Sequence, residues 1–231
     1  MDIFQLPFEI VEYIGSFCDN SEQLNLSLIN EYTYANYHFY SLYLHGNLLF
    51  KNSMLKQDRF SRLCVLECGP KIINIKHLSS LVKLSCKGSK CRISNDEIKE
   101  MKNLQYLDCW DNVYITDIYT PNSKIAILNC GGSGCGIDQK CIEGMINLKE
   151  LHCYGNSKII FVGHLNNSLT VLNCGGEHSK IGQDSIEKLT NLSKLYCYNN
   201  ELINNIDHLE GNLTELTCSG RYNTINKRDI P

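Results

Sequence analysis

The sequence lacks the segments that direct a chain to a membrane or hold it there. No run approaches the roughly 20 apolar residues that a membrane-spanning helix needs. The opening, MDIFQLPFEIVEY, has an acidic second residue and no cationic stretch, so it does not resemble a secretory signal. A formal net charge of -3 provides no basic field for nucleic acid or an anionic membrane. We therefore expect a cytoplasmic protein that binds neither.

The sequence also lacks motifs of catalysis and metal binding. It contains no GxGxxG, P-loop or HExxH, which would hold dinucleotides, phosphates or a catalytic metal. Its 13 cysteines include no C-x2-C pair of the kind that forms zinc sites. A cysteine nucleophile needs a base held by a third group, and His152 would face away from Cys153 on a strand. We expect no cofactor, no metal and no enzymatic activity.

The cysteines instead mark a repeat. The frame Leu-x-x-Leu-x-Cys recurs eight times, with isoleucine once in place of the first leucine. The frames are LCVLEC (63–68), LVKLSC (81–86), LQYLDC (104–109), IAILNC (125–130), LKELHC (148–153), LTVLNC (169–174), LSKLYC (192–197) and LTELTC (213–218). After a first interval of 18 residues, the cysteine spacing alternates between 23 and 21. The unit is therefore a 44-residue pair with a long and a short half.

This spacing resembles the leucine-rich repeat. The resemblance implies an α/β solenoid, a horseshoe with a parallel sheet on its concave face. The frame ends in the alternation expected of a short strand with one face on a core, and stacked repeats make that core continuous. The frame cysteines would take the place of buried leucines, because cysteine behaves as a small hydrophobic residue.

The two halves differ after the strand. In the long half, NDEIKEM (95–101) and QDSIEKL (183–189) place apolar residues at helical spacing. The short half is expected to carry a turn or a 3₁₀ segment. The short half also matches the family's asparagine position, which implies amides that satisfy backbone groups where the chain leaves the strand. These asparagines are Asn112, Asn156 and Asn200, and the long half has Ser89, Ser133 and Glu177 at that place.

Aromatic residues gather where strand residues should face the concave, binding surface of a solenoid. After the frame cysteines, Trp110, Tyr154 and Tyr198 alternate with Gly131 and Gly175. Each ring could cover the backbone of a neighbouring glycine. Alternatively, the rings form a strip for a protein partner, because Trp and Tyr are enriched at interaction hot spots. The predicted target-binding residues are Tyr106, Trp110, His152, Tyr154, Tyr196 and Tyr198.

The first forty residues lie outside the repeat. The stretch LPFEI (6–10) places Pro7 at a position suited to the first turn of a helix, and apolar residues continue at helical spacing. With SLIN (27–30), this stretch resembles an F-box, although the tryptophan often found near the end of that motif is absent. The resemblance implies that the module binds the adaptor Skp1. The residues implied to contact it are Leu6, Pro7, Ile10, Ile14, Leu24 and Leu28.

We expect three parts in the chain. Residues 1–40 form the small α-helical F-box-like module, and residues 63–231 form the repeats, the last of them incomplete. Residues 41–62 are predicted to be a helical linker and N-terminal cap. Within this linker, Leu48, Phe50, Met54 and Leu55 are expected to face inward.

An F-box followed by leucine-rich repeats resembles the F-box/leucine-rich-repeat family. Its members are substrate receptors of SCF-type ubiquitin ligases, in which the F-box binds Skp1 and the repeats bind the target. The bias toward asparagine, isoleucine, lysine and tyrosine resembles such proteins encoded by giant DNA viruses, which implies a host cytoplasm. The alternative is a repeat module that sequesters a partner, with the N-terminal helices serving only as a cap for the solenoid.

Overall fold

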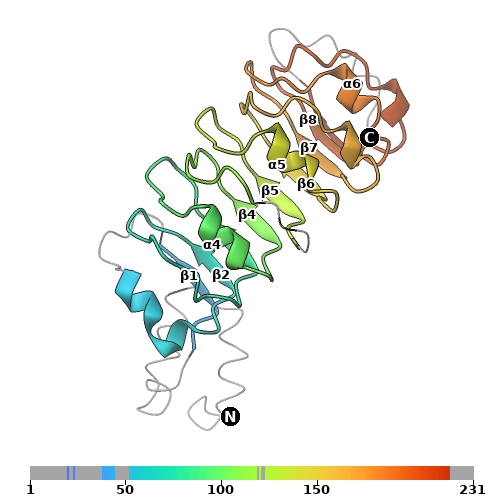
Figure 1. Ribbon diagram of the computed structural model, residues 1–231. Helices are drawn as coiled ribbons and strands as arrows, with labels where there is room; N and C mark the ends of the chain where they lie inside the picture. The colour runs from blue at the N-terminus through green and yellow to red at the C-terminus, as the bar shows by residue number, and fades with distance from the viewer. Residues whose placement is uncertain are drawn as a thin grey trace, which may run out of the picture.

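The structure is a computed structural model that describes residues 20, 23, 38–44, 52–118, 120 and 123–218. Its centre is one sheet of nine parallel strands that follow one another in chain order. The strands are β1 (Ser41–Tyr43), β2 (Val65–Glu67), β3 (Lys83–Ser85), β4 (Tyr106–Asp108), β5 (Ile127–Asn129), β6 (Glu150–His152), β7 (Val171–Asn173), β8 (Lys194–Tyr196) and β9 (Glu215–Thr217). Figure 1 shows them stacked along an elongated molecule. The predicted solenoid is confirmed.

The frame residues make the core. The middle leucine of each strand pairs in register with that of the next, from Leu42 on β1 to Leu216 on β9. All of these leucines except the half-buried Leu216 are at most 6% exposed. Burying one leucine side chain contributes about 1.5–3 kcal/mol, so the stacked frames are the main source of stability. The eight frame cysteines are likewise buried, at 9% exposure or less, as predicted.

The sheet begins earlier than the cysteine frames indicate. Residues 39–44, FYSLYL, form a further frame with phenylalanine first and leucine in the cysteine position, and all three frame side chains are buried. Residues 41–43 are therefore a strand, and the expectation of a helix there is wrong. Two 3₁₀ helices follow, η2 (Asn52–Lys56) and η3 (Asp58–Phe60). Leu55 is buried as expected, but Met54 is 42% exposed, and Leu48 and Phe50 lie outside the described residues.

Short helices cover one side of the sheet (Figure 1). The opposite side is called the open face below. The long halves carry α4 (Asn95–Glu100), α5 (Gln139–Glu143) and α6 (Gln183–Ile186). Two short halves carry single 3₁₀ turns, η4 (Gly163–Leu165) and η5 (Asp207–Leu209). This is the predicted division. Side chains satisfy free backbone groups at the start of α4 and α5: the Glu97 carboxylate accepts from Ser94 N at 3.0 Å, and Asp138 accepts from Cys141 N at 3.1 Å.

Buried asparagines close the turns of the short halves, as predicted. The Asn112 amide nitrogen donates to the carbonyls of Cys86 and Ile93 at 2.9 and 3.3 Å. Its oxygen accepts from Tyr114 N at 2.9 Å. Asn156 and Asn200 repeat this arrangement one and two pairs later.

The long halves turn differently. A glycine two residues after the frame cysteine has a positive φ, between 87° and 99° at Gly88, Gly132 and Gly176, which costs other residues more than glycine. The buried side chain of this turn comes five residues after the cysteine, two later than the sequence alignment placed it. These side chains are Cys91, Cys135 and Ser179, at 5% exposure or less.

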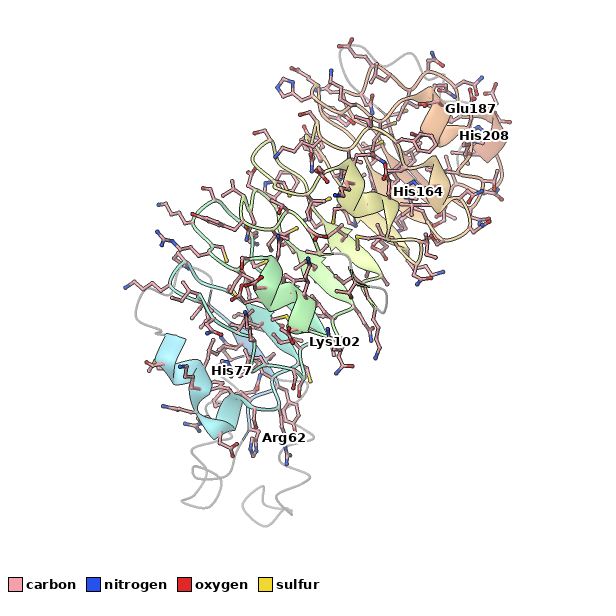
Figure 2. All side chains as sticks on the ribbon, viewed as in Figure 1. Arg62, His77, Lys102, His164, Glu187 and His208 are labelled. Atoms are coloured by element: carbon pink, nitrogen blue, oxygen red, sulfur yellow. The ribbon has the colours of Figure 1, made fainter. Side chains whose placement is uncertain are left out.

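Two further sets of side-chain hydrogen bonds connect successive repeats on the helix-bearing side. The first residue of each α-helix uses its side-chain amide on the backbone of the next short half; Gln139, for example, accepts from Ile160 N and Phe161 N, both at 3.0 Å. Histidines bond back to the ends of preceding helical turns, at 2.9–3.1 Å from carbonyls of Leu55, Ile142 and Ile186. These histidines, His77, His164 and His208, follow one another along the molecule (Figure 2).

Side chains from the N-terminal segment cover the outer edge of β1. Gln23 is fully buried; its oxygen accepts from Tyr40 N at 3.0 Å and its nitrogen donates to Ser41 Oγ and O. Asn20 makes a matching pair of bonds with Tyr43, at 3.1 Å to N and 2.9 Å to O. Two amides thus satisfy backbone groups that an edge strand otherwise leaves unpaired. The predicted Skp1-contact residues lie outside the described residues.

Candidate functional site

The open face of the sheet presents two columns of side chains that flank the buried leucines, because alternate strand residues point to opposite sides. The strand register aligns both columns. The first column is Val65, Lys83, Tyr106, Ile127, Glu150, Val171, Lys194 and Glu215. The second is Glu67, Ser85, Asp108, Asn129, His152, Asn173, Tyr196 and Thr217. Charged, polar and aromatic groups therefore share one surface.

A hollow lies on this face over β6, β7 and β8. It measures about 310 Å³, and it is lined by Glu150, His152, Val171, Asn173, Lys194 and Tyr196. The smaller residues Val171 and Asn173 on the middle strand lie between longer side chains on either flank. The hollow is therefore formed by differences in side-chain length across three strands in register.

Charges around the hollow are partly paired. Lys194 Nζ lies 3.0 Å from Glu215 Oε2, and this carboxylate raises the pKa of Lys194. A hydrogen bond from Tyr196, followed by the one from Lys194, lowers the pKa of Glu215. His152 Nε2 lies 3.5 Å from Glu150 Oε2, an ion pair when the imidazole is protonated. The hollow thus offers both signs of charge, hydroxyl and amide groups.

The N-terminal part of the open face also carries both signs of charge, because Lys87 Nζ lies 3.8 Å from Glu67 Oε1. Asp108, only 7% exposed, accepts from Ser85 Oγ at 3.1 Å and from Trp110 N at 3.2 Å. Burial raises the pKa of the Tyr106 phenol, and three neighbouring carboxylates raise it further. They belong to Asp108, Glu150 and Glu67. Tyr106 therefore lies near three carboxylates, and Lys83 is its partner in register on β3.

The aromatic residues at the strand ends pack on the solenoid itself. Trp110 and Tyr154 stack with ring centroids 6.2 Å apart and planes 20° apart. A Cβ added at Gly131 would collide with the Trp110 ring, and one at Gly175 would lie 3.1 Å from Tyr154 Cδ2. The alternation with glycine leaves room for these rings, which favours the interpretation that they cover glycine backbone. Tyr198 remains 43% exposed.

The six predicted target-binding residues thus fall into two groups. His152 and Tyr196 line the hollow, and Tyr106 lies on the same face two strands before β6. Trp110, Tyr154 and Tyr198 lie at the strand ends instead. The prediction did not include the other four lining residues, which are Glu150, Val171, Asn173 and Lys194. It also missed the helix-start amides, although Asn95, Gln139 and Gln183 each come nine residues after a frame cysteine.

Among the residues that the structure describes, no group of three or more His, Cys, Asp or Glu side chains is placed to hold a metal ion. No helix in that part of the chain is long and apolar enough to span a bilayer.

The repeated frame, nine parallel strands in chain order and the asparagine turns define a leucine-rich-repeat solenoid. Among solved structures, an internalin (inlF) from Listeria monocytogenes is similar, with 21% identity, a TM-score of 0.44, and 92% of this chain matched to 60% of that one. A leucine-rich-repeat protein of Leptospira interrogans has 16% identity and a TM-score of 0.35, with 71% of this chain matched to 54% of its own. Neither a family model nor a curated protein matches the sequence.

Proposed function

We propose that the chain is a non-enzymatic adaptor that binds a protein on the open face of its sheet and Skp1 through residues 1–40, as a substrate receptor of an SCF-type ubiquitin ligase. The observation that carries the first part is the hollow over β6–β8. Its mixture of tyrosine, histidine, amide and both signs of charge suits a polypeptide surface. The mixed charge gives no support to a phosphate-rich ligand.

The second part rests on the F-box resemblance of LPFEI (6–10) and SLIN (27–30). The bonds from Asn20 and Gln23 to β1 support a physical connection between this region and the sheet. Such a connection would hold a bound target at a fixed distance from the adaptor.

The same bonds favour a second candidate function. A solenoid needs its first repeat covered, and the amides of Asn20 and Gln23 already satisfy the outer edge of β1. In this alternative the N-terminal residues are only a cap, and the repeats sequester their partner without ubiquitination.

Binding of purified Skp1 distinguishes the adaptor function from the cap function of the N-terminal residues. We expect the wild-type chain to bind Skp1 and Leu6→Asp with Pro7→Ala to lose that binding while keeping the circular dichroism of the folded protein. A folded wild type that fails to bind would leave the cap as the function of the N-terminal region.

The open face needs a separate measurement. Partners recovered with the tagged chain from expressing cells should be depleted several-fold by His152→Ala with Tyr196→Ala. The matched control is Lys140→Ala, an exposed residue of α5 on the opposite side. Equal recovery by the double variant and the control would contradict binding at the hollow.

A further inference from the structure

A second hollow lies on the helix-bearing side of the solenoid, next to the first 3₁₀ helix. It measures about 360 Å³ and is lined by Lys56, Asn74, Lys76 and His77. Lys56 is the last residue of η2, and the other three belong to the segment between β2 and β3. None of the four is acidic, so we call this the basic hollow. It shares no residue with the hollow over β6–β8.

The contacts of the lining residues determine what the basic hollow can offer a ligand. His77 Nε2 lies 3.0 Å from the carbonyl oxygen of Leu55. Because a carbonyl oxygen only accepts, Nε2 carries the hydrogen of this bond. The Asn74 amide oxygen accepts from Lys76 N at 3.4 Å. Lys76 Nζ lies 3.6 Å from Asp96 Oδ2, and both side chains are exposed, so this ion pair is weak and leaves Lys76 able to attract a second anion.

The next repeat pair neutralises the lysine that corresponds to Lys56. That lysine is Lys99 of α4, and each of the two follows the buried apolar residue of its helical turn. Lys99 Nζ lies 2.6 Å from Asp117 Oδ2, 18 residues later in the chain. The residue at the same distance after Lys56 is Asn74. The first pair thus has an amide where the second has a carboxylate, and Lys56 is exposed beside it.

The third and fourth repeat pairs carry negative charge at the same positions. Three histidines bond to helical carbonyls in the same way, and His77 is the first of them along the molecule (Figure 2). The residue after the accepting carbonyl is Lys56 in the first case and glutamate in the other two. The residue before the histidine is Lys76 in the first case, then glycine and aspartate. The later residues are Glu143, Gly163, Glu187 and Asp207. The positive charge is therefore particular to the first repeat and does not follow from the fold.

We propose that the basic hollow binds the phosphate group of a phosphate monoester, held by the ammonium groups of Lys56 and Lys76 beside the His77 ring. Such a group carries about two negative charges at neutral pH, so it gains from both lysines at once, whereas a carboxylate carries one charge. Lysine binds phosphate as a point charge and needs no fixed geometry. The volume exceeds what one phosphate fills, since a water molecule occupies about 30 Å³ in the liquid. Part of the group that carries the phosphate can therefore enter too.

This site does not depend on the function proposed above. The basic hollow lies on the helix-bearing side, so a protein on the open face and a phosphate in the basic hollow could be bound together. The phosphate can belong to a small molecule or to a phosphorylated side chain, because the two lysines recognise the same chemistry in both.

Imidazole resonances test the proposal with controls inside the same chain. The full chain is titrated with sodium phosphate at constant pH and ionic strength and followed by proton NMR. We expect the ring protons of His77 to shift and saturate. His164 and His208 make the same carbonyl contact beside acidic residues, so they should not shift. Equal shifts of all three histidines, or the same His77 shift with sodium acetate, would overturn the proposal.

Exposed substitutions test which groups hold the phosphate. Lys56→Gln with Lys76→Gln should weaken phosphate binding about tenfold or more. Asn74→Asp should also weaken it, because the new carboxylate would pair with Lys56 as Asp117 does with Lys99. Conversely, Asp96→Asn should strengthen binding by removing the carboxylate that competes for Lys76.

The matched control is Lys140→Gln, an exposed lysine of α5, which should leave binding unchanged. Circular dichroism checks that each variant is folded. Unchanged affinity in both the double-lysine variant and Asn74→Asp would overturn the proposal.

O-phospho-L-serine distinguishes the two sources of the phosphate. Tighter binding of this compound than of inorganic phosphate would indicate a phosphorylated side chain, because the serine part then adds contacts of its own. Equal affinity would indicate recognition of the phosphate alone. A His77 signal that responds to neither compound would overturn the proposal, and it would leave the binding of a protein on the open face unaffected.

Discussion

Asn156 shows how one side chain holds two turns together. Its nitrogen donates to the carbonyls of Cys130 and Ile137 at 2.9 and 3.1 Å, and its oxygen accepts from Lys158 N at 3.0 Å. The residue is 2% exposed, so water cannot replace these bonds. Since a buried backbone group without a partner costs about 1–3 kcal/mol, this amide is worth more than an ordinary surface contact.

We therefore expect Asn156→Ala to lower the free energy of unfolding by about 3 kcal/mol, because it leaves three backbone groups unpaired. Urea denaturation followed by circular dichroism measures this. The control is Ser133→Ala, an exposed residue at the place where alignment to the short half puts the turn residue, and it should change stability by less than about 0.5 kcal/mol. Comparable losses in both variants would contradict the assigned role.

Residue identities predicted the short-half turns but left open how the long-half turns are satisfied. The asparagine lies three residues after its cysteine, as in the family pattern, and its buried position follows. In the long half the left-handed glycine adds two residues before the chain turns inward, so the buried side chains of these turns are Cys91 and Cys135 and not Ser89 and Ser133. The two columns of the open face followed from strand alternation alone. The hollow did not, because it depends on the lengths of side chains from three strands.

At the scale of the element, β1 is one of the two edge strands of the sheet, where an unprotected strand could pair with another chain. Gln23 bonds to Tyr40 and Ser41 in a buried setting, whereas Asn20 bonds to Tyr43, which is 48% exposed. The two amides make similar bonds in different surroundings. Because water can replace only the exposed bonds, the buried amide should matter more.

We expect Gln23→Ala to lower the free energy of unfolding by about 1–3 kcal/mol and Asn20→Ala by less than about 1 kcal/mol. Urea denaturation gives both values, and hydrogen exchange should show faster exchange of the Tyr40 amide in Gln23→Ala alone. If Asn20→Ala lowered the free energy of unfolding more than Gln23→Ala, burial would not determine how much each amide contributes to stability.

The first strand shows why an element can escape sequence reasoning. Alignment on cysteine found eight frames and missed residues 39–44, because Leu44 replaces the cysteine and Phe39 the leading leucine. The physical requirement is a buried apolar side chain, which both residues meet at 6% exposure or less. The bonds from Gln23 had no local signal, since a contact across 17 residues depends on how the N-terminal segment meets the sheet.

At the scale of the molecule, long and short halves depend on each other. The helix-start amide of a long half bonds to the following short half, and the asparagine of that short half bonds back to carbonyls of the long half. Histidines add a third connection in the same direction. The smallest part that preserves all of these contacts is the 44-residue pair.

Deleting residues 131–174, one complete pair, should therefore leave a shorter protein that still unfolds in a single cooperative transition. Deleting only 154–174, a single short half, removes Asn156 and the partners of Gln139, and it places two long halves side by side. We expect this smaller deletion to reduce the thermal midpoint further than the larger one. Differential scanning calorimetry gives the thermal midpoint of both proteins. A higher midpoint for the 154–174 deletion than for the 131–174 deletion would contradict the mutual dependence of long and short halves.

The alternation of long and short halves also determines how such a chain can lengthen or shorten its open face during evolution. Duplication or loss of coding sequence would preserve every lateral bond only in steps of one pair, which adds or removes two strands, or about 10 Å of open face. A gene of this kind would thus adapt to larger or smaller partners in discrete increments. Point substitutions in the two outward-facing columns could then change the binding surface of each added pair without disturbing the leucines and cysteines beneath it.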